Sequence, residues 1–206
     1  MLKRFTLLNR SLLRRNIELN SYEDRVDVYE EAISDVSGRA LFAISTLPNQ
    51  HRLRAPSGDE RKPSIEVATV SLDEFLADKE VDVIRMDLEG AEWLVVKGMK
   101  GILSGNRPLL MFIEMHPELI KDYGGDAVAM LKLFMDAGFN IRYVVASFWR
   151  GISLSHRCKA KRRLLKPQPG LEFDIQEGDP FLSTAMRRIL EGTDCYRVFL
   201  ERSSPQ

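Results

Sequence analysis

Two short apolar runs flank a helical pattern between residues 81 and 115, and this arrangement constrains the fold more than any other feature of the chain. Residues 81–86 and 109–115 each have the length and apolar character of a buried strand, and residues 91–103 between them have the spacing of a helix. Apolar strands connected by a helix are typical of parallel sheets. The sequence therefore predicts an α/β fold whose sheet is mostly parallel and covered by helices on both faces.

The rest of the chain extends this alternation on both sides. Ser71 and Glu74 have the spacing of a capping box, and Asn20 is a plausible C-cap. Helices are predicted at residues 6–19, 71–76, 126–137 and 183–190, and further strands near residues 25–30 and at 38–45, 64–70, 140–148 and 195–202. The last two strands are expected to form an antiparallel edge, residues 48–64 a loop, and residues 1–206 a single domain.

Composition excludes several functional classes. The 206 residues include 30 basic and 30 acidic side chains, so no net charge favours nucleic acid or a membrane surface as a partner. No stretch approaches the roughly 18 continuous apolar residues of a membrane-spanning helix. Cys158 and Cys195 have neither a CxxC pattern nor a histidine at metal-ligand spacing. The sequence therefore predicts free thiols, a cytoplasmic location and no metal site.

An acidic cluster follows the strand at residues 81–86. In open α/β sheets, ligands bind outside the carboxyl ends of the strands, which is where Asp87, Glu89 and Glu92 are placed around Gly90. Acids in the first turn of a helix also offset its dipole, which alone would explain Glu89 and Glu92. Asp87 precedes the helix and would need partners if buried. Asp87 is therefore the strongest site candidate, Glu89 is undecided, and Glu92 is interpreted mainly as a helix-dipole residue.

The neighbouring predicted strand ends in a second titratable pair, Glu114 and His116. Residues two apart in an extended chain point the same way, so both side chains can face one site. His116 could take up a proton near neutral pH while Glu114 holds its tautomer. Alternatively, a histidine before Pro117 is simply a turn residue. Two adjacent strands that both end in titratable groups favour an active site over a purely structural role.

Two further features concern anionic ligands. Residues 156–166 include seven basic or histidine side chains, which form either a solvated loop or a patch for an anionic substrate or lipid headgroup. No GxGxxG or GxxxxGK sequence is present. The chain therefore contains no recognisable phosphate-binding loop of its own, which argues against a self-contained dinucleotide or nucleoside triphosphate site.

Several stretches together resemble the FkbM family of S-adenosylmethionine-dependent methyltransferases. In order, they are "RRNIELN", "VYEEAISDVSGRALF", "VATVSLDEFL", "VIRMDLEGAEWLVVKGMKGIL" and "PLLMFIEMHPEL", and the resemblance covers about residues 9–119. It implies a Rossmann-like class I methyltransferase fold of seven strands with an antiparallel terminal hairpin. The family's first one or two strands, with their glycine-rich cofactor loop, would precede residue 6. They are expected upstream of this sequence, on a second chain, or to be lost in a degenerate fragment.

The resemblance also implies roles for the candidate residues. His116 would be the base or would orient an acceptor hydroxyl, supported by Glu114, while Asp87 and Glu89 would line the same mouth. Asp87 would also contact the cofactor, S-adenosylmethionine. By their place after a family strand, Glu31 and Ala32 would lie near its adenine. The acceptor would be a hydroxyl on a sugar, a lipid-linked glycan or a polyketide-like product.

Two other functional classes remain open from the sequence. One is a non-catalytic remnant or accessory domain of a methyltransferase that binds no cofactor by itself. The other is an α/β enzyme acting on nucleotide sugars, which fits the acid-ended strands but has no motif of its own here.

Overall fold

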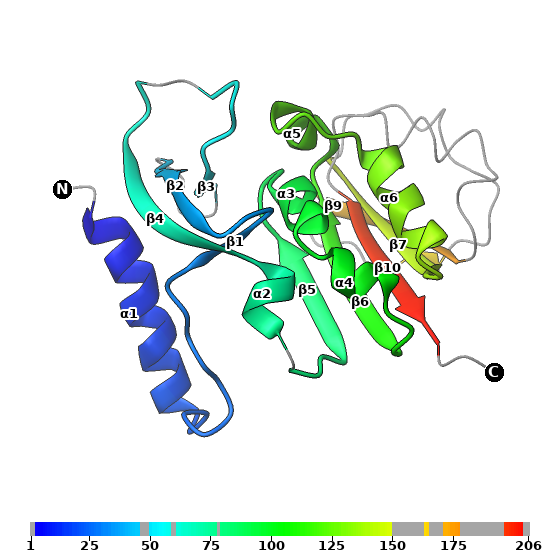
Figure 1. Ribbon diagram of the computed structural model, residues 1–206, viewed down its shortest axis with the longest axis horizontal. Helices are drawn as coiled ribbons and strands as arrows, with labels where there is room; N and C mark the ends of the chain where they lie inside the picture. Colours follow the sequence, from blue (N-terminus) through cyan, green and yellow to red (C-terminus); the bar gives the residue numbers. More distant parts are fainter. Residues whose placement is uncertain are drawn as a thin grey trace.

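The computed structural model describes residues 3–45, 50–58, 61–77, 79–149, 163–164, 171–177 and 196–203, and their strands form two sheets (Figure 1). The first sheet follows helix α1 (Lys3–Leu19). Its strands are β1 (Ala32–Ser34), β2 (Gly38–Ala43), β3 (Arg52–Leu53) and β4 (Ser64–Ser71). Their order is β1-β4-β2-β3, with β1 parallel to β4 and the other pairs antiparallel.

The second sheet contains the predicted strand–helix–strand unit. Its strands are β5 (Val83–Asp87), β6 (Leu109–Met115), β7 (Asn140–Trp149), β8 (Arg163–Leu164), β9 (Leu171–Glu177) and β10 (Tyr196–Arg202), in the order β5-β6-β10-β7-β9-β8. Strands β5 and β6 are parallel, as predicted. Strand β10 lies antiparallel between β6 and β7, so the predicted antiparallel pairing of these two late strands is confirmed. The prediction that they form an edge is wrong, because β10 is internal and β9 and β8 lie beyond β7.

The α/β class is confirmed, but the expectation of a mostly parallel sheet is wrong for the described strands. Only β1–β4 and β5–β6 are parallel among their pairings. The physical reason is the place of β10, which runs between β6 and β7 and ends the parallel order after two strands. The described residues thus form mixed sheets that are compatible with a methyltransferase fold.

The helices explain how the second sheet is packed. They are α2 (Leu72–Leu76), α3 (Glu92–Lys97), α4 (Lys100–Ser104), α5 (Pro117–Asp122) and α6 (Ala127–Asp136). Helices α3, α4 and α6 lie over one face of the sheet (Figure 1), where Met111, Ile113 and Val198 are almost completely buried. On the other face Val83 and Leu110 are exposed. Within the described residues, the prediction that helices cover both faces is therefore wrong.

The helix predicted at residues 91–103 is interrupted at Gly98. A Cβ atom at Gly98 would lie 2.2 Å from the carbonyl oxygen of Ser34, so the backbone of β1 approaches too closely for any side chain. Helix α4 then begins anew, with the carboxylate of Asp73 accepting hydrogen bonds from the backbone N–H groups of Gly101 and Ile102 at 2.8 and 3.1 Å. Packing between the first sheet and the helix layer thus requires glycine at the break.

Other local predictions have mixed outcomes. The Oγ atom of Ser71 accepts a hydrogen bond from the Glu74 N–H at 3.2 Å, as a capping residue should. Residues near Val26 are not in a strand; the strand begins at Ala32 instead. The predicted helix at 183–190 and both cysteines lie outside the described residues, as does the basic segment 156–166 apart from β8.

No helix among the described residues is both long enough and apolar enough to cross a membrane.

Candidate active site

The two acid-ended strands lie side by side, as predicted. In the parallel ladder between β5 and β6, Asp87 is the register partner of Glu114. Asp87 is the last residue of β5, and His116 follows directly after β6 as the N-cap residue of α5. The carboxyl ends of the only parallel pair in the described part of the second sheet therefore bring Asp87, Glu114 and His116 to one edge.

The turn after β5 has an unusual backbone. Glu89 has a φ of 52° and Gly90 a φ of 98°, both in the left-handed region. A Cβ atom at Gly90 would lie 2.6 Å from the Cβ atom of Leu119 and 2.7 Å from its carbonyl oxygen. Glycine is required at position 90 because α5 packs directly against the turn. A left-handed conformation at Glu89 costs on the order of 1–3 kcal/mol, which the surrounding contacts must offset.

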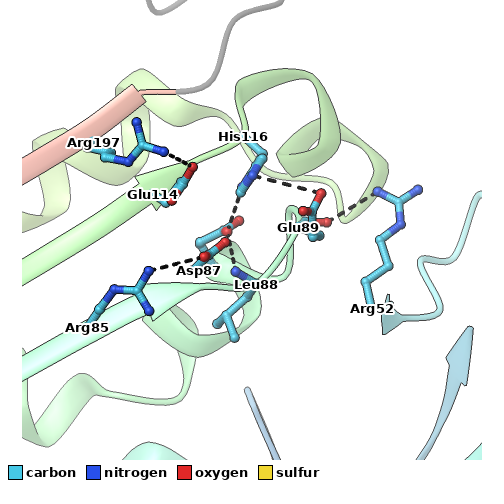
Figure 2. Close-up of polar contacts among 9 residues, drawn as sticks. Arg52, Arg85, Asp87, Leu88, Glu89, Glu114, His116 and Arg197 are labelled. Atoms are coloured by element: carbon cyan, nitrogen blue, oxygen red, sulfur yellow. Dashed lines mark hydrogen bonds and ion pairs between the residues drawn. The ribbon is translucent and has the colours of Figure 1, made fainter. Parts of the chain in front are cut away.

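The imidazole of His116 lies between two carboxylates (Figure 2). Its Nδ1 atom is 3.0 Å from Oε1 of Glu92, and its Nε2 atom is 3.9 Å from Oε2 of Glu89. The ring is only 13% exposed. One ring nitrogen is therefore fixed by a hydrogen bond, and the other faces the turn after β5.

The sequence prediction underestimated Glu92, which it interpreted mainly as a helix-dipole residue. It does occupy the first turn of α3, where an acid favours the helix dipole. However, its side chain is fully buried, and Oε1 also accepts a hydrogen bond from the Leu88 N–H at 2.9 Å. Side chains of a helix lean toward its N-terminus, so the side chain of Glu92 points back toward the end of β5. The position of Glu92 in the first turn of the predicted helix, five residues after Asp87, could therefore have indicated its place in the site.

The surroundings of Glu89 change the ionisation of its carboxyl group. Burial raises the pKa of its carboxyl group, and the negative charges of Asp87 and Glu92 raise it further. His116 and Arg52 oppose this shift. Arg52 comes from β3 and donates hydrogen bonds to the Glu89 carbonyl at 3.3 Å and to Asp122 at 3.0 Å. Sequence reasoning missed Arg52 because residues 48–64 read as a plain loop.

Asp87 and Glu114 have arginine partners. Arg85 lies 3.4 Å from the Asp87 carboxylate, and Arg197 of β10 donates a hydrogen bond to Glu114 at 2.9 Å (Figure 2). The prediction that Glu114 holds the tautomer of His116 therefore needs correction. The carboxylate at hydrogen-bond distance from the ring is that of Glu92, because the chain leaves the strand conformation at His116.

Glu31 and Ala32 lie at the start of β1 in the first sheet rather than at the ends of β5 and β6. They were predicted to follow a strand, but Ala32 begins β1 and the exposed Glu31 precedes it. Ala32 packs against a small apolar cluster that includes Leu53, Ala91 and Tyr123. This cluster joins the first sheet to the helix that carries Glu92.

Residues 2–141 match the family model of the methyltransferase FkbM domain. The chain belongs to the FkbM methyltransferase family. No curated protein and no solved structure matches the chain. Asp87, Glu89, Glu92, Glu114 and His116 all lie within the matched part of the chain, whereas Arg197, the partner of Glu114, lies beyond it.

A pocket of about 560 Å³ opens beside Glu89 and α5. Glu89, Leu119 and Asp122 form one side of it, and residues of the first sheet and its loops, among them Arg52 and Lys62, form the other. Its volume is in the range of small-molecule sites. The pocket therefore places a space for a ligand next to the residue that faces Nε2 of His116.

Proposed function

We propose that this FkbM-family protein is an S-adenosylmethionine-dependent methyltransferase that methylates a hydroxyl oxygen of a sugar, glycan or natural-product-like acceptor. Family membership supports methyl transfer. The observation that carries the proposal is the His116 imidazole, held at Nδ1 by a buried carboxylate 3.0 Å away at the carboxyl ends of two parallel strands. This is the edge at which open α/β sheets bind their ligands.

Asp87, Glu31 and Ala32 suit the chemical groups of the proposed cofactor. S-adenosylmethionine, when bound, supplies an electrophilic methyl group. Asp87, 37% exposed, offers a carboxylate for the cofactor's ammonium group. Ala32 lies against apolar residues, as an adenine ring requires, and the exposed carboxylate of Glu31 precedes it. We propose Asp87, Glu31 and Ala32 as cofactor contacts on this basis.

His116 and its partners would prepare the acceptor oxygen. Nδ1 is held by Glu92, and Nε2, which faces Glu89, would orient an acceptor hydroxyl and take its proton. The oxygen then forms a bond to the methyl carbon as the bond from carbon to sulfur breaks, and the proton stays on the imidazole. Glu89, 3.9 Å away, would stabilise the imidazolium that results. Most of the rate gain would come from alignment of the reacting atoms.

The pocket beside Glu89 is the proposed acceptor site. Ser57, Arg54 and Lys62 lie on its wall. Side chains of this kind donate hydrogen bonds, which suits an acceptor rich in hydroxyl groups. The acceptor class is thus a polyhydroxylated molecule rather than an apolar one.

A labelled-methyl assay tests the proposal. The protein is incubated with S-adenosylmethionine carrying a labelled methyl group and with a panel of sugars, glycans and hydroxylated natural products. Transfer to an acceptor oxygen is expected, and His116→Ala should reduce turnover by about 10²–10⁴-fold. Wild-type turnover in His116→Ala would remove His116 from this role, and an unaffected double variant Asp87→Asn, Glu89→Gln would do the same for the carboxylates.

Calorimetry with S-adenosylhomocysteine separates this function from its alternative, a remnant domain that binds no cofactor. The proposed enzyme should give a measurable heat of binding that weakens in Asp87→Asn and Glu31→Gln. A protein that gives no heat with either S-adenosylhomocysteine or S-adenosylmethionine is a remnant, and the proposal is then wrong.

A further inference from the structure

The side chains of Asp87, Glu89 and His116 are arranged as metal ligands would be. One ligand atom each from Asp87, Glu89 and His116 lies within 4.8 Å of the other two. Two ligands that both lie about 2.1 Å from one ion can be no more than roughly 4.2 Å apart. Small rotations of the carboxylates would therefore bring all three atoms into the first coordination shell of a single cation.

The hydrogen bond at the far side of His116 is the second observation. A metal-binding histidine usually donates its other ring N–H to a carboxylate, which fixes the tautomer and directs the free nitrogen at the ion. Glu92 occupies this position, with Oε1 at 3.0 Å from Nδ1 of His116. The histidine is thus already oriented with Nε2 toward Glu89.

The buried charge of Glu92 is the third observation. Its side chain is fully buried, and its Oε2 atom has no hydrogen-bond partner in the described part of the chain. A buried carboxylate is costly unless positive charge lies nearby. With Asp87 and Glu89 nearby, three carboxylates surround the single imidazole of His116. Arg85 is 72% exposed, and Arg52 is shared with Asp122. A divalent cation would balance this excess of negative charge.

We propose that Asp87, Glu89 and His116 bind one divalent cation, with Glu92 as the positioning residue behind His116. Two carboxylates and one imidazole suit a borderline ion such as Mn²⁺ or Zn²⁺ better than Mg²⁺ or Ca²⁺, which prefer oxygen ligands throughout. Three protein ligands would leave coordination positions open toward the adjoining pocket.

This inference deepens the proposed function and rests on it for its consequence. A cation at the mouth of the pocket would contact the acceptor hydroxyl oxygen and make it more acidic, with the proton leaving to water. Nε2 of His116 would then act through the ion rather than take the proton itself. Binding of the ion can be measured without any methyl transfer, so the two proposals fail separately.

The test measures Mn²⁺ binding directly. The full chain is treated with chelator, dialysed and titrated with MnCl₂ while electron paramagnetic resonance follows the free ion, and ZnCl₂ is then added as a competitor. Saturable binding of one Mn²⁺ per chain, displaced by Zn²⁺, is the expected result. A chain that shows no saturable binding overturns the proposal, whatever its methyltransferase activity.

Variants locate the site. Asp87→Asn, Glu89→Gln and His116→Gln should each weaken Mn²⁺ binding more than Glu92→Gln, for which a loss of about 10–100-fold is expected. Glu118→Gln is the matched control, because it removes the same charge from an exposed residue of α5 two positions from His116. Asp87 is the most exposed of the three ligands, so Asp87→Asn keeps the test valid if another variant fails to fold. Wild-type affinity in folded Asp87→Asn and Glu89→Gln would show that the ion binds elsewhere and would refute the proposal.

Discussion

The Nδ1 atom of His116 lies 3.0 Å from Oε1 of Glu92, a carboxylate that is fully buried. The two residues are 24 positions apart and come from the start of α3 and the start of α5. Their contact ties the two helices that follow the parallel strands to each other. The orientation of the imidazole is therefore set by the packing of these two helices.

Glu92→Gln should lower methyl transfer at least about tenfold while the protein remains folded. The amide keeps the size of the side chain and can still accept from the Leu88 N–H, but it no longer offers a charged acceptor to Nδ1. The measurement is a pH–rate profile of the labelled-methyl assay. Because Glu92 acts through His116, the profile itself should change shape, whereas a purely structural defect would lower the rate equally at every pH.

Glu89→Gln should change the pH dependence of stability. The pKa of Glu89 is raised above its ordinary value of 4.5 in the folded protein, chiefly by burial, so the folded state binds this proton more tightly than the unfolded state. Stability therefore falls as the pH rises from about 4.5 through the folded-state pKa. Glu89→Gln removes this loss and should be relatively more stable above that window than below it.

Urea unfolding between pH 4 and pH 8, in the presence of chelator, measures the effect. Glu118→Gln is the control for loss of an acid at an exposed position of α5. A difference in stability between wild type and Glu89→Gln that stays constant across the pH range would contradict the prediction.

Gly90→Ala should destabilise the fold by about 2–4 kcal/mol. The new Cβ atom would meet the backbone of Leu119 at 2.7 Å, and the φ of 98° is unfavourable for any side chain. Gly124→Ala is a matched control, because its φ is 73° but nothing lies within 4 Å of the added atom. The control should lose only about 1–2 kcal/mol, the cost of the left-handed backbone. Equal losses in denaturant unfolding would mean that contact with α5 contributes nothing.

The local elements of the second sheet were predictable because short-range patterns determine them. Strand β6 has the predicted bounds, and β10 and α6 differ from the prediction by one residue at their ends. Asp126 caps α6 with a hydrogen bond from the Ala129 N–H at 2.7 Å, which is the kind of signal a sequence shows. Asp87 and His116 were found in the same way, as polar residues at the ends of apolar runs.

What the sequence did not show is set by contacts between distant residues. The insertion of β10 between β6 and β7 depends on pairing across more than 80 positions, for example between Arg197 and Glu114. The contact that requires glycine at position 98 comes from β1, and Arg52 reaches the site from 37 residues before Glu89. Local periodicity contains no information on such contacts.

Tyr123 should titrate above the ordinary tyrosine pKa of 10. Its hydroxyl donates a hydrogen bond to the Leu53 carbonyl, and burial raises its pKa to about 12. Absorbance at alkaline pH, compared between wild type and Tyr123→Phe, isolates its ionisation. Because the folded-state pKa exceeds the unfolded value of 10, the tyrosine's contribution to stability is lost as the pH rises from 10 toward 12. A difference spectrum with a midpoint near pH 10 in the folded protein would contradict this.

Arg202→Lys should destabilise the protein by about 2–4 kcal/mol although the charge is kept. Arg202 is 7% exposed, and its guanidinium donates to the carbonyls of Ile102, Leu103 and Arg107 at 2.9–3.0 Å. A lysine ammonium is a single point with three donors and cannot reach this spread of acceptors, so buried carbonyls lose their partners. Arg142→Lys on β7 is the control, since Arg142 is 59% exposed and pairs with Glu201 at the surface, where less than about 1 kcal/mol is at stake. Urea unfolding of both variants should therefore separate them clearly, and similar midpoints would show that the guanidinium does not join α4 to the sheet in the way that its hydrogen bonds indicate.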